Sequence, residues 1–518
     1  MLGVVGAGAA WLFDSMLSGS QHLFLDQLAN YPAANLESGH LPRPSWWIVV
    51  ATTLGGLITG FLVFTFAPEA EGHGTDTAVK ALHRDDGNIR PRVPFLKAIA
   101  SAITIGSGGS AGREGPIALI AAGIGSIYAR LTGRPATERR LLLLAGMSAG
   151  LSAIFRSPIG TALFAVEVLY SRMELEAWAL AYCLLSSVVA YAVTLSFSDS
   201  GPIFQVRDLP TPEAAQYPYY LLLGLIAGVV GVILPYVFYK VRDFFRALPV
   251  PAQIKPAIGG FGVGVISLYY PQILGGGYGT IRQAIAGNLA LSLLLILILV
   301  KIIALSLTVS SGGSGGVFAP GLFVGAMLGG AIAHLTGQPP EPFVIVGMGA
   351  VFSGAARVPI SSILMIAEMT SSYQLLAPAT FAILASFMVQ TALSSRSPYP
   401  TLYEAQVPGR SDSPAHTVES LIEAMESISH TADPAKIRID LFKLLKTHVP
   451  IKFEKYQFHL RALGPQDEWN GTTIASVEAS GETQIVAVLR EESSLFPSPE
   501  LLLSQGDLLL LSTETAEA

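Results

Sequence analysis

Five long stretches of the chain contain no Asp, Glu, Lys or Arg and are predominantly apolar. They are Trp46–Ala67, Ala177–Ser198, Tyr217–Tyr239, Ile302–Pro340 and Met369–Ser395. A helix that crosses the hydrocarbon core of a bilayer needs about 20 apolar residues, so each stretch is long enough to span it. The pattern predicts an all-α membrane domain with many passes, whose main solvent is lipid.

Composition modifies this prediction, because glycine and proline are too frequent for a bundle of uninterrupted helices. The 518 residues include 52 Gly and 33 Pro. Non-helical backbone at membrane depth is tolerated only where protein buries it or where it lines a water-filled cavity. We therefore expect broken or re-entrant helices around a pathway. The formal net charge of −6 is too diffuse to indicate a nucleic-acid partner.

Three segments recur in the same order about 200 residues later in the chain. Gly106–Pro116 returns as Ser310–Pro320, Met147–Ser171 returns as Met348–Ser372, and Gly72-His-Gly-Thr75 returns as Gly277-Tyr-Gly-Thr280. A common order and a nearly common offset indicate that the membrane part is duplicated. In transporters with internal repeats, ion sites lie near the midplane where interrupted segments of both halves meet. Both an inverted and a parallel repeat fit the pattern alone.

The chain changes character after Tyr403, where charged residues become frequent. We expect a membrane domain over residues 1–405, with halves of about 1–200 and 216–405, then a linker with helices over 406–455 and a soluble domain over 456–518. Expected helices are Thr417–Ser429 and Asp433–His448, and expected strands are Phe458–Leu463, Thr483–Leu489 and Asp507–Ser512. The C-terminal part is therefore predicted to be a small α+β domain.

The duplicated glycine-rich runs can bind an anion with backbone alone. Each run leads into a helix that starts close to a proline, at Pro116 and Pro320, and free N–H groups at a helix start point at a ligand. Close packing of helices through glycine is the structural alternative. Glu114 lies at the first of these helix starts, where its carboxylate competes with an anion for the same N–H groups. Protonation of Glu114 would free the site, so this residue can act as a gate, a proton carrier or both.

The motifs resemble signatures of the CLC family of chloride channels and transporters. Gly112-Arg-Glu-Gly-Pro116 and Gly316-Val-Phe-Ala-Pro320 are similar to two of its signatures, and Pro400-Thr-Leu-Tyr403 is similar to its pore-tyrosine segment. The resemblance implies an inverted repeat, a homodimer with one pore per subunit, chloride held by main-chain amides, and a gating role for Glu114. The candidate chloride-binding residues are His73, Gly74, Arg113, Glu114, Gly115, Val317, Phe318 and Tyr403.

Two positions depart from the family pattern. The first anion motif usually has serine where this chain has His73, and a protonated imidazole there would bind an anion more strongly and make conduction depend on pH. A packed or surface histidine is the alternative. The internal glutamate of the proton-coupled exchangers falls on Val168, which cannot relay a proton. Glu167 precedes it and recurs as Glu368, which favours a structural role for both.

Val168 favours a chloride channel or uncoupled anion transporter over a chloride/proton antiporter, which stays open as the alternative. A fluoride-selective transporter is a third and less favoured possibility. No nucleophile–base pair, cofactor motif or metal-ligand cluster indicates an enzyme, a bound cofactor or a metal site. Expected partners are chloride, other small anions, protons under the antiporter alternative, and the lipid bilayer.

Residues 463–513 resemble the C-terminal RCK (TrkA-C) domain of potassium-transport regulators. The likeness rests on Asn470–Ile474, Val486–Arg490, Pro497–Glu500 and Gln505–Asp507. It implies a small dimeric module on the cytoplasmic side, either sensing a small-molecule ligand or serving only as a dimerisation cap. Together these features predict a prokaryotic inner (cell) membrane protein with a cytoplasmic C-terminal domain.

Overall fold

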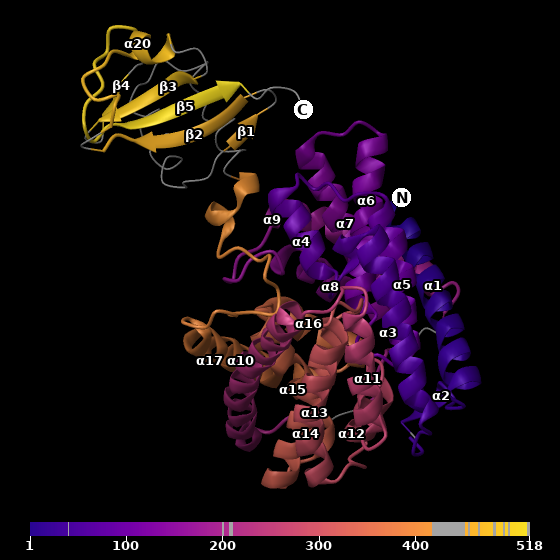
Figure 1. Ribbon diagram of the computed structural model, residues 1–518. Coiled ribbons are helices and arrows are strands. Elements are labelled where there is room, and N and C mark those ends of the chain that lie inside the picture. Colours follow the sequence, from indigo (N-terminus) through magenta and orange to yellow (C-terminus); the bar gives the residue numbers. More distant parts are fainter. Residues whose placement is uncertain are drawn as a thin grey trace. The chain divides into compact units, whose positions relative to one another are not determined.

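The computed structural model describes residues 1–39, 41–198, 201–206, 211–416, 451–453, 456–464, 467–479, 483–490, 493–495 and 498–514. The chain forms two compact units, Met1–Pro408 and Gly409–Ala518, and each is described by itself (Figure 1). The helices expected at Thr417–Ser429 and Asp433–His448 lie outside the described residues.

The first unit is helical throughout its two halves. The helices of the first half are α1 (Leu2–Gln21), α2 (Ala34–Ser38), α3 (Trp47–Phe66), α4 (Thr75–Arg84), α5 (Arg92–Gly106), α6 (Glu114–Leu131), α7 (Ala136–Phe155), α8 (Pro158–Glu167) and α9 (Ala177–Thr194). Those of the second half are α10 (Tyr217–Ala247), α11 (Lys255–Ser267), α12 (Tyr278–Ile285), α13 (Leu291–Val309), α14 (Phe318–Thr336), α15 (Pro340–Ala356), α16 (Pro359–Thr370) and α17 (Leu376–Ser394).

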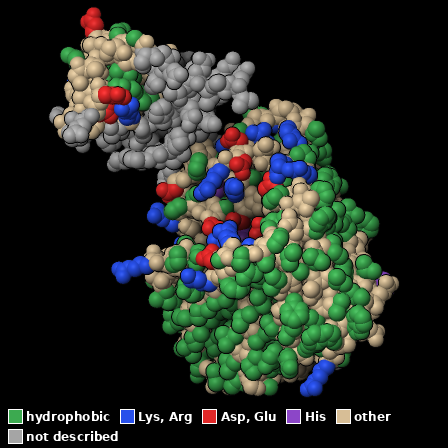
Figure 2. Space-filling view, in the orientation of Figure 1, with side chains coloured by type: hydrophobic (Ala, Val, Ile, Leu, Met, Phe, Trp, Pro, Cys, Tyr) green, Lys and Arg blue, Asp and Glu red, His purple; other side chains and the backbone are tan. Residues whose placement is uncertain are grey.

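Seven helices of the described chain are long and apolar enough to cross a bilayer. They are Leu2–Leu28, Trp47–Phe66, Ala177–Thr194, Ala214–Ala247, Leu291–Val309, Phe318–Thr336 and Tyr373–Ser394. Large apolar side chains on them face outward, such as Leu185 and Met388, which are 67% and 69% exposed. Hydrophobic side chains cover most of the visible face of this unit, and charged ones gather at one end (Figure 2). Such an apolar exterior is the one that lipid requires.

The uncharged stretch Ile302–Pro340 contains a helix break at the glycine-rich run, where the sequence predicts one. Within Ile302–Pro340, α13 ends at Val309 and α14 starts at Phe318, and the glycine-rich segment between them is non-helical. Gly312 in that segment has φ +102°, a conformation that residues with a side chain rarely adopt. Gly108 in the first half has the same φ of +102°. The repeat therefore reproduces the helix break itself.

The two halves are related as an inverted repeat. Gly112 N donates to Gly316 O over 2.8 Å, and Gly316 N donates to Gly112 O over 2.7 Å, so the runs pass each other in opposite directions. Such a reciprocal antiparallel pair has a two-fold axis between its members, as an inverted duplication requires. Equivalent helices also end alike. Both α7 and α15 are followed by an arginine whose backbone is in the left-handed conformation, Arg156 (φ 53°) and Arg357 (φ 58°).

The second unit contains one antiparallel sheet with strand order β1-β2-β5-β3-β4. Its strands are β1 (Ile451–Phe453), β2 (Tyr456–Ala462), β3 (Thr483–Arg490), β4 (Ser493–Leu495) and β5 (Leu508–Glu514), and its short helix is α20 (Ile474–Glu478). The strands β2, β3 and β5 lie where the alternating pattern predicts strands. Eight residues form its small core: Leu463, Ile474, Val477, Ile485, Val488, Leu503, Leu509 and Leu511.

Candidate anion-binding site

Two glycine-rich runs cross at the centre of the first unit and place the starts of α6 and α14 close together. A Cβ added to Gly316 would lie 2.7 Å from Gly115 N, and one added to Gly115 would lie 2.0 Å from His73 O. Neither position therefore accepts a side chain without movement of the backbone. Neither helix start has a side-chain cap, so the first N–H groups of both are available to a ligand.

The third repeated segment joins this crossing. Gly72 N donates to Gly313 O over 3.0 Å, and Gly315 N donates to Gly72 O over 3.1 Å. Ser314 Oγ adds a bond to Ala70 O over 3.0 Å. Segments that are distant along the chain are thus held together by main-chain hydrogen bonds.

Glu114, the first residue of α6, is buried in this crossing, with 1% of its surface exposed. Tyr278 donates its hydroxyl proton to Glu114 Oε1. The backbone amide of Ala319, in the first turn of α14, faces the carboxylate. Glu114 Oε2 lies so close to Gly112 that a Cβ there would be 2.1 Å from this oxygen. The carboxylate therefore occupies the space where the two helix starts meet.

Arg113 precedes Glu114, but its side chain takes a different direction. Its guanidinium Nη1 lies 2.5 Å from Asp14 Oδ1, and its Cζ lies 5.7 Å from the centre of the Tyr278 ring. The side chain lines an open hollow of about 1110 Å³, which we call the arginine vestibule. Its charged lining residues are Asp14, Glu37, Arg113, Arg156, Arg282 and Glu341. A smaller pocket of about 180 Å³ shares Arg113 and Arg282 and includes Tyr278.

His73 and Tyr403 come together near the start of α6, where His73 O lies against Gly115. Their ring centres are 5.3 Å apart, and both side chains are buried. His73 Nδ1 has no hydrogen-bond partner, although it is buried. His73 and Gly74 line a hollow of about 200 Å³, the histidine vestibule, together with Asp76, Arg242 and Glu404. The two vestibules share no lining residue and are therefore separate hollows.

Val317 and Phe318 contribute backbone rather than side chains to the crossing. The Phe318 ring packs 4.2 Å from that of Phe352 and 4.4 Å from that of Phe155, measured between ring centres. The Val317 side chain is 2% exposed. Their amides begin α14, where the helix dipole favours a negative charge.

Val168 caps the C-terminal end of α8 and is fully buried. Its carbonyl accepts a hydrogen bond from Gln406 Nε2 over 3.0 Å. The side chain packs in the apolar core of the unit. The position therefore offers no group that can take up a proton.

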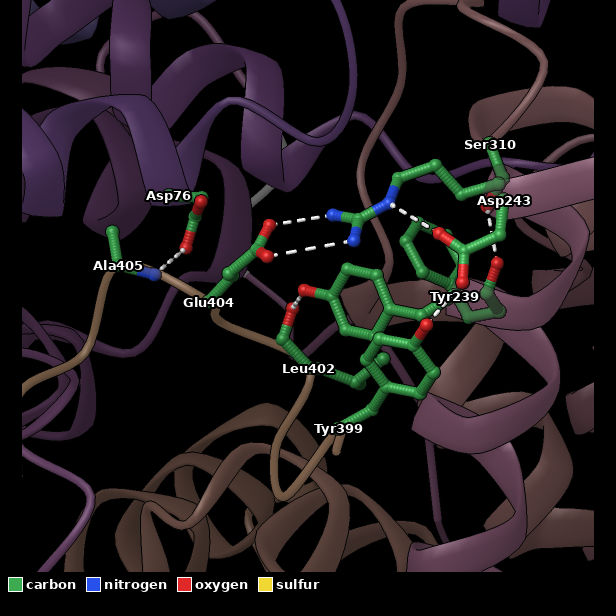
Figure 3. Close-up of polar contacts among 10 residues, drawn as sticks. Asp76, Tyr239, Asp243, Ser310, Tyr399, Leu402, Glu404 and Ala405 are labelled. Atoms are coloured by element: carbon green, nitrogen blue, oxygen red, sulfur yellow. Dashed lines mark hydrogen bonds and ion pairs between the residues drawn. The ribbon is translucent and has the colours of Figure 1, made fainter. Parts of the chain in front are cut away.

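A polar network that the sequence did not reveal fastens the segment around Tyr403 (Figure 3). Arg242 on α10 makes an ion pair with Glu404, with Nη1 2.5 Å from Oε2. Tyr239 donates to Leu402 O over 2.7 Å, and Ala405 N donates to Asp76 Oδ1 over 2.8 Å. These bonds attach the pore-tyrosine segment to α10 and to α4. The only signal in the sequence was a cluster of charges after an uncharged run.

Two buried lysines were also missed, and the repeat relates them. Lys97 Nζ donates to Ala70 O over 3.0 Å and to Gly72 O over 2.6 Å. Lys301 Nζ donates to Ile273 O and Gly275 O, both over 2.8 Å. Each ammonium thus holds the loop that leads into the repeated Gly-x-Gly-Thr segment. A comparison of charged residues at the common offset would have found this pair.

Comparison with known proteins gives concordant results. A family model described as voltage gated chloride channel matches residues 55–391. A putative chloride channel protein ClcB-like of Ralstonia nicotianae is 30% identical over 366 residues, which cover 68% of this chain and 85% of that protein. An H(+)/Cl(−) exchange transporter ClcA of Citrobacter koseri is 31% identical over 374 residues, covering 68% and 77% of the two chains.

Solved structures agree in fold. A slow cyanobacterial Cl−/H+ antiporter superimposes with a TM-score of 0.68 at 23% identity, covering 78% of this chain and 94% of that one. A CLC-type fluoride/proton antiporter gives a TM-score of 0.66 at 21% identity, with coverages of 78% and 95%. The match extends over the greater part of both neighbours, so the helical arrangement described above is theirs as well.

Proposed function

Because the chain belongs to the CLC family of anion-transporting membrane proteins, we propose that it conducts chloride and other small anions through a pore gated by Glu114. The observation that carries this proposal is the place of the Glu114 carboxylate, which lies where two uncapped helix starts meet. A carboxylate is itself an anion, so it competes with chloride for these N–H groups. Protonation or displacement of Glu114 opens the site, and the ionised side chain closes it.

The residues proposed to contact the anion follow from this arrangement. Backbone amides of Glu114, Gly115, Val317 and Phe318 provide donors at the helix starts. His73 contributes its side chain from the histidine vestibule, Gly74 lies beside it, and Tyr403 contributes the ring that packs against His73. Arg113 acts through its field, since its guanidinium faces Asp14 in the arginine vestibule. Few charged donors touch the anion, which suits binding that is weak enough for release.

Uncoupled conduction is the leading mode. Val168 supports it, because a buried valine offers no proton-binding group at the position where the family's exchangers have a glutamate. Chloride/proton exchange is the second candidate, and the relative named H(+)/Cl(−) exchange transporter favours it. The buried, unpartnered Nδ1 of His73 is a group through which exchange could proceed without that glutamate.

A flux assay in liposomes separates these modes. Purified full-length protein is reconstituted, a chloride gradient is imposed, and chloride and internal pH are recorded together. Chloride movement without proton movement supports the channel, whereas proton uptake driven by chloride contradicts it and establishes exchange. Fluoride in place of chloride tests the fluoride-selective alternative in the same vesicles. If proton coupling is absent because Val168 replaces the glutamate, the variant Val168→Glu should introduce proton coupling.

The gate is tested by Glu114→Gln, which keeps the shape of the side chain and removes its charge. We expect higher chloride flux at neutral pH and a flatter dependence on pH, because glutamine no longer competes as an anion. Glu341→Gln is the control, since Glu341 lines the arginine vestibule and is not part of the crossing. Flux of Glu114→Gln that equals the wild type at every pH would refute the gate.

We further propose a homodimer with one pore per subunit in the cell membrane, and a cytoplasmic C-terminal domain. The support is the family resemblance together with apolar side chains exposed on the long helices. Cross-linking in membranes tests the dimer, and protease access to the C-terminal unit in oriented vesicles tests its side. Thermal shift of the full-length protein with nucleotides and other small molecules tests whether that unit binds a ligand.

A further inference from the structure

We propose that Tyr278 is a positioning residue of the gate, whose hydroxyl holds the Glu114 carboxylate in the anion site. Loss of this hydrogen bond is then part of opening. The inference rests on the proposed role of Glu114 and adds a second residue, from the other half of the repeat, that controls it. Neither the glycine-rich motifs nor the pore-tyrosine segment includes Tyr278.

The contact itself is direct. Tyr278 donates its hydroxyl proton to Glu114 Oε1, and among the described residues it is the side chain that hydrogen-bonds this carboxylate, whose other neighbours are backbone amides at the helix starts. Glu114 Oε2 has no side-chain partner among these residues. The phenol hydroxyl therefore adds the one side-chain hydrogen bond that orients the carboxylate among the described residues. A hydrogen bond to an ionised acceptor is stronger than one between neutral groups, so this bond favours the ionised, closed form.

The groups that surround the Tyr278 ring fix the direction in which its hydroxyl points. Gly277, with φ +82°, starts α12 directly before it. The Phe204 ring packs on Tyr278 with 5.8 Å between ring centres. Arg113 lies over the same ring, and Asp14 holds that guanidinium. The ring is thus enclosed by parts of the chain from both halves, and the hydroxyl has little freedom to turn away from Glu114.

The two equivalent positions of the repeat carry different side chains, and only one of the two side chains bonds to the gate. His73 and Tyr278 occupy the same place in the repeated Gly-x-Gly-Thr segment. His73 lies in the histidine vestibule, where its ring faces Tyr403 and its carbonyl abuts Gly115. Tyr278 lies in the pocket that joins the arginine vestibule and contacts Glu114. At the duplicated position, His73 thus lies beside the proposed anion path, whereas Tyr278 holds the gate residue Glu114.

The consequence for transport has a defined direction. Removal of a donor to an ionised carboxylate makes its protonation easier. The charged and titratable groups around Glu114 are Arg113 directly before its helix, Tyr278 on α12, and Tyr403 and His73, whose rings face each other. With Tyr278 changed to phenylalanine, Arg113 and Tyr403 are unaltered. We therefore expect flux to rise about tenfold at neutral pH, and the flux–pH curve to move to higher pH by about one unit.

The experiment uses full-length protein in liposomes of fixed composition, with chloride flux recorded from about pH 4 to 9. Tyr278→Phe keeps the ring that packs on Phe204 and removes only the hydroxyl. Tyr220→Phe is the matched control, because Tyr220 is fully buried and its hydroxyl has no hydrogen-bond partner among the described residues. The control should leave the flux–pH curve unchanged. Thermal unfolding of each variant in detergent verifies that it is folded.

The double variant Tyr278→Phe/Glu114→Gln separates a latch from a general packing role. If Tyr278 acts through Glu114, the double variant has the flux of Glu114→Gln alone. A further change of flux in the double variant would overturn the latch, as would an unaltered curve for Tyr278→Phe while Glu114→Gln is faster. If Glu114→Gln itself has wild-type flux, the gate proposal fails and the latch fails with it. Should Tyr278→Phe not fold, Tyr278→Leu also removes the donor to Glu114 and tests the same curve.

Discussion

Glu167 and Glu368 each cap the start of the helix that carries the other, across the two halves of the repeat. Glu167 ends α8, and its carboxylate accepts hydrogen bonds from Ile360 N over 2.9 Å and Ser361 N over 2.7 Å, in the first turn of α16. Glu368, on α16, accepts from Gly160 N over 2.8 Å and from Ser157 Oγ over 2.6 Å at the start of α8. A negative charge at a helix N-terminus satisfies free N–H groups and interacts favourably with the helix dipole.

This relationship predicts that both glutamates stabilise the fold and that Glu167 does not carry protons. Glu167→Ala and Glu368→Ala should each reduce stability by about 1–3 kcal/mol, because each leaves buried donors without an acceptor. Thermal unfolding in detergent measures the loss. Glutamine variants should fall between alanine and wild type, since one oxygen can still accept. Abolished proton movement in Glu167→Gln at unchanged stability would contradict the structural role.

The crossing of the glycine runs predicts a sharp effect at Gly316. A Cβ there would approach Gly115 N to 2.7 Å, and Gly112 O to 2.9 Å, so Gly316→Ala must push the helix starts apart. We expect chloride binding, measured by calorimetry, to weaken at least about tenfold, because the amides no longer converge. Gly8→Ala is the control, since a Cβ at Gly8 meets nothing within 4 Å and alanine favours a helix. Wild-type chloride affinity in Gly316→Ala would refute the crossing as the binding site.

The ion pair between Arg242 and Glu404 predicts that the position of Tyr403 depends on α10. Arg242→Met should free the segment that carries Tyr403 and weaken chloride binding a few-fold. A double-mutant cycle with Glu404→Gln should give a coupling of about 1 kcal/mol or less, because Glu404 is 59% exposed and solvent screens the pair. Calorimetry on the four proteins provides both numbers. Equal affinities in all four would show that the network does not position Tyr403.

The sequence predicted the duplicated membrane domain and its helix breaks because these depend on composition, spacing and glycine. The pairing of the motifs around Gly112 and Gly316 was anticipated, and the structure brings the two runs together with reciprocal hydrogen bonds. The inverted sense of the repeat was not decided by the pattern of residues alone. A repeated pattern states which segments are equivalent, and only their hydrogen bonds in three dimensions show the direction in which they meet.

Side-chain contacts between distant segments were the part that could not be predicted. Tyr278 was visible only as one letter in a repeated segment, and its contact with Glu114 depends on the path of the chain between α10 and α12. Lys97 and Lys301 were missed because a lysine near an uncharged run normally indicates the end of a membrane segment. Both are instead fully buried and bond to backbone carbonyls. Burial of a charge is a property of the packed fold.

In the C-terminal unit, the ion pair between Arg490 and Asp507 predicts a stability that depends on pH. Asp507 is fully buried, and Arg490 lies 2.8 Å away at both of its carboxylate oxygens. Burial alone would raise the pKa of Asp507, but the hydrogen bonds from Arg490 and from Ser504 N outweigh it and hold this pKa below its usual value. A carboxyl group whose pKa is lowered by folding stabilises the folded state at every pH above its unfolded value of about 4. That contribution is lost as the pH falls through the lower, folded value.

Asp507→Asn should therefore destabilise this unit at pH 7 by about 1–2 kcal/mol, a moderate amount because Arg490 is 34% exposed. Hydrogen exchange of the full-length protein, followed by mass spectrometry on peptides from β3 and β5, measures the difference from wild type at each pH. We expect faster exchange in the variant at pH 7, and a difference from wild type that shrinks as the pH falls below about 4 and through the lowered, folded pKa of Asp507. Glu500→Gln, at an exposed position, should match wild type throughout. A difference that persists undiminished at pH 3 would mean that asparagine disturbs the packing and that the charge of Asp507 contributes nothing.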